Sequence, residues 1–417
     1  MAQKAWVISP YQKTERSCEA QLEEAVGLAE AIKLDVIAAQ AVPVREIRPA
    51  TYLGKGVVDR LKTNFERPDV VIMDCALSPI QQRNLEKIWQ TKVIDRTALI
   101  LEIFGRRAQT KEGTLQVELA HLTYQRSRLV RSWTHLERQR GGMGFLGGPG
   151  ETQIEMDRRL IDERLMRIKK ELKAVESRRG LHRKARQKVP FPVVALVGYT
   201  NAGKSTLFNR LTKADVFAED LLFATLDPTM RQVELPSGRK VILSDTVGFI
   251  SHLPHELVAA FRATLEEILE ADLILHIRDA SHADTQAQKQ DVETVLKEIS
   301  AKGTVLEVMN KIDKLSETDR TVLQARSRGK YAVISAKNGT GTEDLLKQVD
   351  AFFKSRLKKY QIRFSAADGK TFSWLYEKGC VEKATLKEMD FIMEIRMDDV
   401  LLKGLLERNA SVVFMNA

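Results

Sequence analysis

The feature that most constrains this chain is a glycine-rich loop that follows an apolar strand and precedes a helix. Residues 191–197 form a nearly uninterrupted apolar run, which is typical of a buried strand. Residues 198–205 then match the pattern G-x-x-x-x-G-K-S, and a helical pattern follows from Thr206. Backbone N–H groups at the start of such a helix bind phosphate. The order of strand, loop and helix therefore predicts a P-loop in a doubly wound, mostly parallel α/β domain.

The side chains of the loop have separate predicted roles. We expect the Lys204 ammonium to bridge the β- and γ-phosphates of a nucleotide and the Ser205 hydroxyl to bind Mg²⁺. The predicted nucleotide-binding residues of this segment are Gly198, Tyr199, Thr200, Asn201, Ala202, Gly203, Lys204, Ser205 and Thr206.

Two further segments would complete phosphate and metal binding. Asp245 ends an apolar strand and begins a D-x-x-G motif, so its carboxylate is expected to hold Mg²⁺ through water. The Gly248 amide is expected to contact the γ-phosphate. Upstream, Thr225 is the predicted switch I ligand of Mg²⁺, with Thr229 as the alternative. The predicted nucleotide-binding residues of these segments are Phe223, Ala224, Thr225, Leu226, Asp227, Asp245, Thr246, Val247 and Gly248.

A loop after the predicted strand at 304–309 is expected to select the base of the nucleotide. The loop is Asn310-Lys311-Ile312-Asp313, and the Asp313 carboxylate can accept hydrogen bonds from both N1–H and the 2-amino group of guanine. Adenine lacks this pair of donors, and a buried polar group left unpaired is costly. The backbone amides of Ser335-Ala336-Lys337 are expected to contact guanine O6. The ordered set of segments therefore predicts a GTPase that binds GTP and GDP.

The residue after the D-x-x-G motif bears on how GTP would be hydrolysed. Many GTPases place a glutamine there to orient water, whereas this chain has Phe249, which cannot hydrogen-bond water in that way. One hypothesis is that a partner completes the site and stimulates turnover. The other is that Asn201, which resembles an asparagine of K⁺-recruiting GTPases, helps K⁺ to replace an arginine finger; a structural or ribose-side role is the alternative. The predicted catalytic residues are Lys204, Thr225, Gly248 and Asn201.

A chain of 417 residues is too long for one core and implies roughly two to four domains. The predicted domains are a small α/β domain (1–104), a helical hairpin (105–188), the P-loop domain (189–357) and a small α/β unit (358–417). In the first, strands near 6–8, 36–39, 70–73 and 92–95 alternate with helices near 15–33, 54–61 and 78–89. The last is expected to contain a strand, a helix, two strands and a helix.

The hairpin prediction depends on two heptad-like apolar stripes separated by a glycine-rich tip. The stripes are Leu115, Leu119, Leu122, Leu129, Trp133 and Leu136, with Arg126 at the skipped position, and Ile154, Ile161, Leu165, Ile168, Leu172 and Val175. The tip, residues 141–150, contains six glycines and is expected to be irregular. From 105 to 188 there are 21 lysines and arginines against 10 acidic residues, whereas the whole chain has a net charge of +10. This excess favours binding to an RNA backbone, and a solvated coiled coil is the alternative.

The remaining features concern location. No run of 18 or more apolar residues exists, so we expect no membrane span, and the apolar stretch at residues 5–8 is too short for a signal peptide. Cys18, Cys75 and Cys380 fit no metal-ligand spacing and are expected to be reduced thiols. We therefore expect a cytoplasmic monomer, with peripheral membrane association as the alternative location.

Several of these segments together resemble the HflX family of translation-related GTPases. The resemblance is carried by residues 198–206, 223–229, 245–250 and 253–261 in the P-loop domain. Outside that domain, residues 148–159, which include Glu151, Gln153 and Glu155, resemble the family's signature between two long helices, and 53–56 also fit. The resemblance covers about residues 1–357.

Membership of this family would imply binding to the ribosome, chiefly to rRNA of the large subunit, through the N-terminal domain and the hairpin. It would also imply splitting or rescue of stalled ribosomes under stress, ribosome-stimulated GTP hydrolysis and, in some members, ATP hydrolysis. Two alternatives are a GTP-timed assembly or scaffold factor and a tRNA-modification GTPase. The latter shares the asparagine-bearing P-loop but usually carries a C-terminal catalytic cysteine, and Cys380 lies in no such motif.

Overall fold

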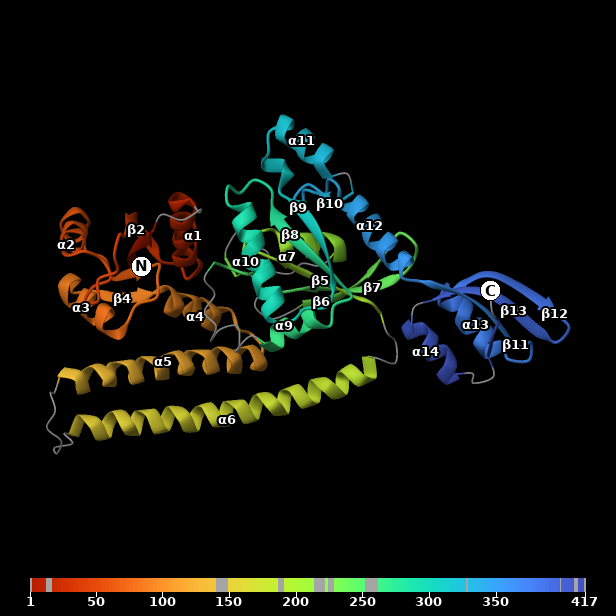
Figure 1. The fold of residues 1–417 in the computed structure, drawn as a ribbon, viewed down its shortest axis with the longest axis horizontal. Coiled ribbons are helices and arrows are strands. Elements are labelled where there is room, and N and C mark those ends of the chain that lie inside the picture. The colour runs from red at the N-terminus through yellow and green to blue at the C-terminus, as the bar shows by residue number, and fades with distance from the viewer. Residues whose placement is uncertain are drawn as a thin grey trace.

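The computed structural model contains three sheets that follow one another along the chain (Figure 1). It describes residues 2–12, 17–139, 149–186, 191–213, 222–223, 229–251, 262–327, 329–397, 399–408 and 412–415. The first sheet is parallel, the second is mostly parallel and the third is antiparallel. The predicted α/β class is confirmed.

The first sheet carries helices on both faces. Its strand order is β2 (Asp35–Pro43), β1 (Lys4–Tyr11), β3 (Val70–Met73) and β4 (Lys92–Asp95). Its helices are α1 (Cys18–Ala31), α2 (Lys55–Asn64), α3 (Pro79–Trp89) and α4 (Arg96–Arg107). Successive side chains point to opposite faces, so Val7 shares a core with α1 and α4 while Trp6 shares one with α2 and α3. The predicted strands and helices are present, and α4 is an additional helix.

The hairpin consists of two long antiparallel helices, α5 (Lys111–Gln139) and α6 (Pro149–Arg186). Leu115 packs with Ile168 and Leu172 between them, as the apolar stripes predicted. Arg126 compensates for its place in the stripe by forming an ion pair with Asp162 at 2.7 Å. The prediction of an irregular tip is wrong for its last two residues, 149–150, which begin α6. Proline is favoured in the first turn of a helix, and Pro149 occupies that place. Residues 140–148 lie outside the described part of the chain.

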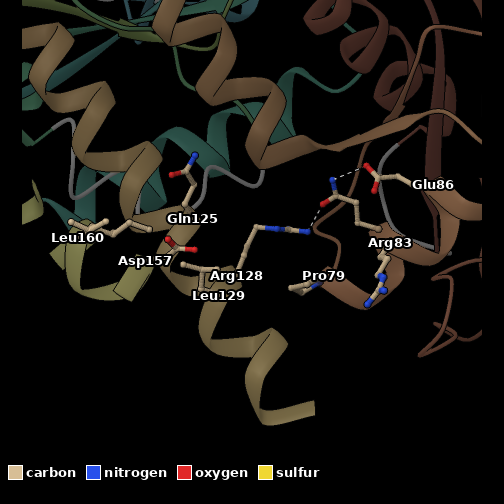
Figure 2. A pocket seen from close by; sticks show the side chains of 10 residues that line it. Pro79, Arg83, Glu86, Gln125, Arg128, Leu129, Asp157 and Leu160 are labelled. Atoms are coloured by element: carbon tan, nitrogen blue, oxygen red, sulfur yellow. Dashed lines mark hydrogen bonds between the residues drawn. The ribbon is translucent and has the colours of Figure 1, made fainter. Parts of the chain in front are cut away.

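A hollow of about 570 Å³ separates α3 from the hairpin (Figure 2). Arg128 of α5, which lines the hollow, donates to the Leu77 carbonyl at 3.1 Å and pairs with the Asp95 carboxylate at 3.2 Å. The Tyr124 hydroxyl also donates to Asp95, at 2.8 Å. These contacts fasten the hairpin to the first sheet. The labelled lining residues are Pro79, Arg83, Glu86, Gln125, Arg128, Leu129, Asp157 and Leu160.

The central sheet has the strand order β10 (Tyr331–Val333), β9 (Thr304–Asn310), β8 (Leu273–Asp279), β5 (Val193–Gly198), β7 (Lys240–Asp245) and β6 (Thr229–Glu234). Only β6 is antiparallel to its neighbour in the described sheet. The associated helices are α7 (Lys204–Thr212), α9 (Arg262–Leu269), α10 (Thr285–Glu298), α11 (Glu317–Ser327) and α12 (Thr342–Ser355), with a 3-10 turn at Ile312–Lys314. The carboxyl ends of β5, β7 and β9 lie at one edge, where parallel sheets bind ligands.

The third sheet is antiparallel, in the order β12 (Val381–Lys387), β13 (Asp390–Met397), β11 (Lys358–Ser365) and β14 (Val413–Met415). Helices α13 (Gly369–Glu377) and α14 (Asp399–Arg408) belong to the same unit, and their core includes Leu375 and Leu405. The expected strand, helix, two strands and helix are present. The sequence pattern did not predict β14, which pairs with β11.

The first and central sheets share one hydrophobic core. It joins Leu28 of α1 and Phe104 of α4 to Tyr199, Phe223 and Phe249 from the P-loop side of the central sheet. The Phe104 and Phe223 rings meet edge to face with their centroids 4.6 Å apart. The N-terminal unit is therefore packed against the predicted nucleotide site. Within the described ranges, no helix is both long and apolar enough to cross a membrane.

Candidate functional site

The P-loop leaves β5 at the carboxyl edge of the central sheet and leads directly into α7. Gly203 precedes α7 with a φ of +90°, and a Cβ there would collide with the side-chain amide of Asn310. A Cβ on Gly198 would collide with the Ile277 carbonyl of β8. Both motif glycines are therefore required by close neighbours, and Gly203 also by its left-handed backbone. The N-terminus of α7, whose first-turn N–H groups and partial positive charge favour an anion, lies next to this loop.

Lys204, the first residue of α7, is buried beneath the loop. Its ammonium donates to the carbonyl oxygens of Gly198 at 3.1 Å and Tyr199 at 2.8 Å, which leaves one N–H for a phosphate. Burial lowers the pKa of Lys204 to about 8, and the negative charge of Asp245 offsets part of that effect. An anion bound here would stabilise the charged ammonium.

The predicted metal ligands Ser205 and Asp245 are neighbours in space. The Ser205 hydroxyl donates to Asp245 Oδ2 at 2.7 Å, and Asp245 is fully buried at the end of β7. A hydroxyl and a buried carboxylate are oxygen donors of the kind that Mg²⁺ prefers, so this pair fits the ion. The other predicted ligand, Thr225, lies outside the described residues. Its alternative, Thr229, begins β6 and is the register partner of Asp245.

The predicted guanine-binding loops come together at the ends of β9 and β10. The Ser335 hydroxyl donates to Asp313 Oδ1 at 2.6 Å, and this hydrogen bond lowers the pKa of Asp313. The carboxylate therefore stays ionised and can accept from two donors of a base. Lys311 forms an ion pair with Asp279 at 3.0 Å, and Ile312 is buried beside it. These contacts hold the loop that carries Asp313.

Asn310 connects three segments of the site. Its side-chain amide donates to the Ala202 carbonyl of the P-loop at 2.8 Å, and its Oδ1 accepts from the Ala336 N–H at 2.9 Å. Arg210 of α7 was not predicted, yet its Nε donates to the Ala336 carbonyl at 2.6 Å and its guanidinium also contacts the Lys337 carbonyl. Nothing in the local sequence marks Arg210, since its partners lie more than a hundred positions away. Hydrogen bonds thus connect the P-loop, α7 and the two base-binding loops.

The D-x-x-G segment lies directly against the P-loop. A Cβ on Gly248 would approach the Thr200 side chain to 2.8 Å and the Lys204 ammonium to 3.1 Å, so only glycine fits. The next residue, Phe249, has its side chain in the shared core, 1% exposed, and pairs through its backbone with Gly198 and Thr200. The Thr246 hydroxyl, which donates to the Leu196 carbonyl, and the buried Val247 anchor the segment to β5 and the core.

Asn201 and the residues around it have mixed placements. Asn201 is exposed with a φ of +58°, and its Oδ1 accepts from the Lys311 ammonium at 3.3 Å. Thr206 is exposed in the first turn of α7. The Phe223 ring packs on Phe104 in the core that also contains Tyr199 of the P-loop. The predicted segment Ala224-Thr225-Leu226-Asp227 lies outside the described residues.

Comparison with known proteins places this geometry in a family. Family models match residues 19–105 ("GTP-binding GTPase N-terminal"), 107–186 ("GTP-binding GTPase Middle Region") and 193–311 ("50S ribosome-binding GTPase"). The GTPase HflX of Magnetococcus marinus is 52% identical over 366 residues, which cover 87% of this chain and 84% of that protein. The chain belongs to the HflX family of GTPases. The resemblance predicted from the motifs is thereby confirmed.

Other HflX proteins are similarly related. The GTPase HflX of Escherichia coli K12 is 44% identical over 88% of this chain and 87% of its own length. Among solved structures, a GTP-binding protein of Sulfolobus solfataricus in complex with GDP is 24% identical, covers 84% of this chain and 98% of its own, and has a TM-score of 0.45. HflX GTPases hydrolyse GTP, and this chain is accordingly a GTP-hydrolysing enzyme.

Proposed function

We propose that this HflX GTPase acts on the ribosome, binding the large subunit through its N-terminal unit and basic hairpin and splitting or rescuing stalled ribosomes. The observation that carries the proposal is the distribution of charge. The segment 105–188 holds 21 basic against 10 acidic residues, an excess that is larger than the net charge of the whole chain, +10. Most of that segment forms two long helices beside the first sheet (Figure 1), a shape suited to an RNA backbone.

The family model that matches residues 193–311 supports the same partner, because its description is a 50S ribosome-binding GTPase. A GTP-timed assembly or scaffold factor is the second candidate, since a charged hairpin could also bind a protein. The tRNA-modification alternative has less support, because Cys380 is buried in the core of the third sheet.

The roles of the site residues belong to the same proposal. Lys204 binds the β- and γ-phosphates, Ser205 and Asp245 hold Mg²⁺, and the Gly248 amide contacts the γ-phosphate. The metal ion supplies positive charge to the phosphoryl oxygens. Asp313 binds the guanine edge, while Asn310 keeps its loop in register with the P-loop.

Sedimentation with ribosomal subunits tests the partner. We expect the protein to pellet with the large subunit in a non-hydrolysable GTP analogue and to remain in the supernatant with GDP. GTP hydrolysis should rise when ribosomes are added. Absence of large-subunit binding in both nucleotides would contradict the proposal and favour the scaffold alternative.

We propose that GTP turnover depends on a group other than Phe249. The Phe249 ring is buried in the shared core, so it does not take the place of the glutamine that orients water in many GTPases. A ribosomal partner or K⁺ bound near Asn201 could supply the missing stabilisation. In the structure, Asn201 Oδ1 already accepts from Lys311, so K⁺ would have to compete with that ammonium. Equal GTP turnover in potassium and sodium buffers would exclude the potassium role.

A further inference from the structure

A buried polar cluster connects the N-terminal unit to the P-loop and to the segment after D-x-x-G. Its members are Glu24 of α1, Arg96 of α4, Tyr199 of the P-loop and Ser251. Glu24 and Arg96 lie outside every motif of the nucleotide site. The cluster therefore brings side chains of another unit to within hydrogen-bonding distance of the two segments that are predicted to surround the terminal phosphate.

The hydrogen bonds of the cluster are arranged around Ser251. Its backbone N–H donates to the Tyr199 hydroxyl oxygen at 2.6 Å, and the Tyr199 hydroxyl donates to the Glu24 carboxylate. The Ser251 hydroxyl donates to Glu24 Oε1 at 2.6 Å. The Arg96 guanidinium donates to the Ser251 carbonyl at 3.0 Å and to its hydroxyl at 2.8 Å. Backbone and side chain of Ser251 are thus both held by the N-terminal unit.

Arg96 is itself fixed in place by charge. It forms ion pairs with Glu24 and Asp74, and its side chain is only 7% exposed. Burial alone would lower the pKa of Arg96, but the charges of Asp74 and Glu24 raise it, so the guanidinium remains charged. A buried charge network of this kind adopts one arrangement and resists displacement, because breaking one pair leaves a charge without compensation.

The position that this cluster imposes on the D-x-x-G segment affects the P-loop. The Thr200 N–H donates to the Phe249 carbonyl at 2.6 Å, and the Phe249 N–H donates to the Gly198 carbonyl at 3.1 Å. P-loop N–H groups ordinarily face phosphate oxygens. Here the Phe249 carbonyl occupies the Thr200 N–H as part of a parallel bridge between Tyr199 and Phe249, and its partial negative charge would oppose an anion at that N–H. Only Ile250 separates Phe249 from Ser251, so a displacement of Phe249 would strain the contacts of Ser251.

Helices α1 and α4 also contact Leu222 and Phe223, which precede the predicted switch I residue Thr225. Phe223 packs on Phe104 of α4, and the Leu222 side chain lies 3.3 Å from the position of a Cβ on Gly27 of α1. Helices α1 and α4 therefore contact the P-loop, the end of switch I and the D-x-x-G segment together. This arrangement adds apolar packing to the polar cluster.

We propose that Glu24 and Arg96 are positioning residues that hold the D-x-x-G segment in the arrangement that favours GDP over GTP. Binding of the γ-phosphate has to pull Phe249 away from Thr200, which withdraws Ser251 from Glu24 and Arg96. By reciprocity of linked equilibria, GTP then weakens the docking of α1 and α4 on the central sheet. The inference rests on the GTPase activity of the family and does not depend on the ribosome.

The test compares nucleotide affinities of the full-length protein with those of a Glu24→Gln variant. The variant keeps the side-chain volume but removes the charge that holds Arg96 and Ser251. We expect affinity for a non-hydrolysable GTP analogue to rise roughly tenfold, the scale of one charge-assisted hydrogen bond, while GDP affinity changes less than about twofold. Glu66→Gln is the matched control, because it removes an exposed N-terminal ion pair with Lys4 far from the cluster.

A second variant guards against loss of folding. Ser251→Ala leaves the buried ion pairs intact and removes only the hydroxyl between Glu24 and Arg96, so it should raise the ratio of GTP-analogue to GDP affinity in the same direction. Thermal unfolding checks that each variant is folded. An unchanged ratio in both folded variants, or a ratio that shifts toward GDP, would overturn the proposal.

Discussion

Lys204 shows how burial prepares a side chain for an anion. Its ammonium is held by two backbone carbonyls and has no full ion pair of its own among the described contacts. The negative charge of Asp245 raises the pKa of Lys204, but burial lowers it by more. The pKa is therefore about 8. A lysine with this pKa loses its proton at mildly alkaline pH unless an anion is bound beside it.

This lowered pKa predicts a pH-dependent affinity for GDP. Phosphate stabilises the charged form of Lys204, so above a pH of about 8 the free protein has to take up a proton when nucleotide binds. We expect GDP affinity to be nearly constant below about pH 7 and to fall above about pH 8, approaching roughly tenfold per pH unit. Titrations with fluorescent GDP across the range from about pH 6.5 to about pH 9.5 would measure this dependence, because the range spans the lowered pKa on both sides.

The control is Lys204→Arg, whose guanidinium remains charged throughout that range. It should bind GDP more weakly at neutral pH, because its shape differs, and should lack the alkaline fall. If the fall persists in the arginine variant, another group is responsible.

At the scale of the element, the strands were predictable where apolar runs are bounded by turn residues. Strands β3 and β4 coincide with the predicted strands at 70–73 and 92–95, whereas β1 extends on both sides of the predicted 6–8. Helix α4 was missed because Asp95 ends β4 and caps α4 at once, so no loop residue separates the two patterns. Strand β14 was missed because it spans only Val413–Met415, and its pairing with β11 is long-range.

The hairpin allows a prediction at the same scale. Reversing the charges of Arg178, Arg179, Arg183 and Lys184 in α6 should weaken ribosome association roughly tenfold or more, because each basic residue facing a phosphate releases counterions. GDP affinity should not change, since this end of the hairpin belongs to none of the nucleotide-binding segments. Pelleting with large subunits and GDP titration measure the two quantities.

The matched control reverses four basic residues of the third unit, Lys370, Lys378, Lys383 and Lys387, which changes the net charge equally. Equal loss of ribosome association in both variants would show that net charge, and not the hairpin, is responsible. No loss in the hairpin variant would refute its role in binding RNA.

At the scale of the whole molecule, the junction between the N-terminal unit and the central sheet was the part that the sequence did not reveal. The P-loop and the base-binding loops were predictable because their binding residues lie in short contiguous sequence motifs. Glu24 and Arg96 are 72 positions apart, and Ser251 is 155 positions beyond Arg96, so no local pattern joins them. The junction forms only when α1 and α4 pack against the central sheet.

The distribution of charge gives the prediction that belongs to this scale. If the hairpin contacts roughly five phosphates, the logarithm of ribosome affinity should fall with the logarithm of salt concentration with a slope near −4, at about 0.7–0.9 per phosphate. Raising the salt concentration from about 50 mM to about 200 mM would then weaken binding by roughly two orders of magnitude. The hairpin variant with four reversed charges should show a shallower slope, whereas the third-unit variant should keep the slope of the unaltered protein. A slope near zero in the unaltered protein would mean that the basic hairpin does not bind RNA phosphates, and ribosome binding would then require uncharged contacts.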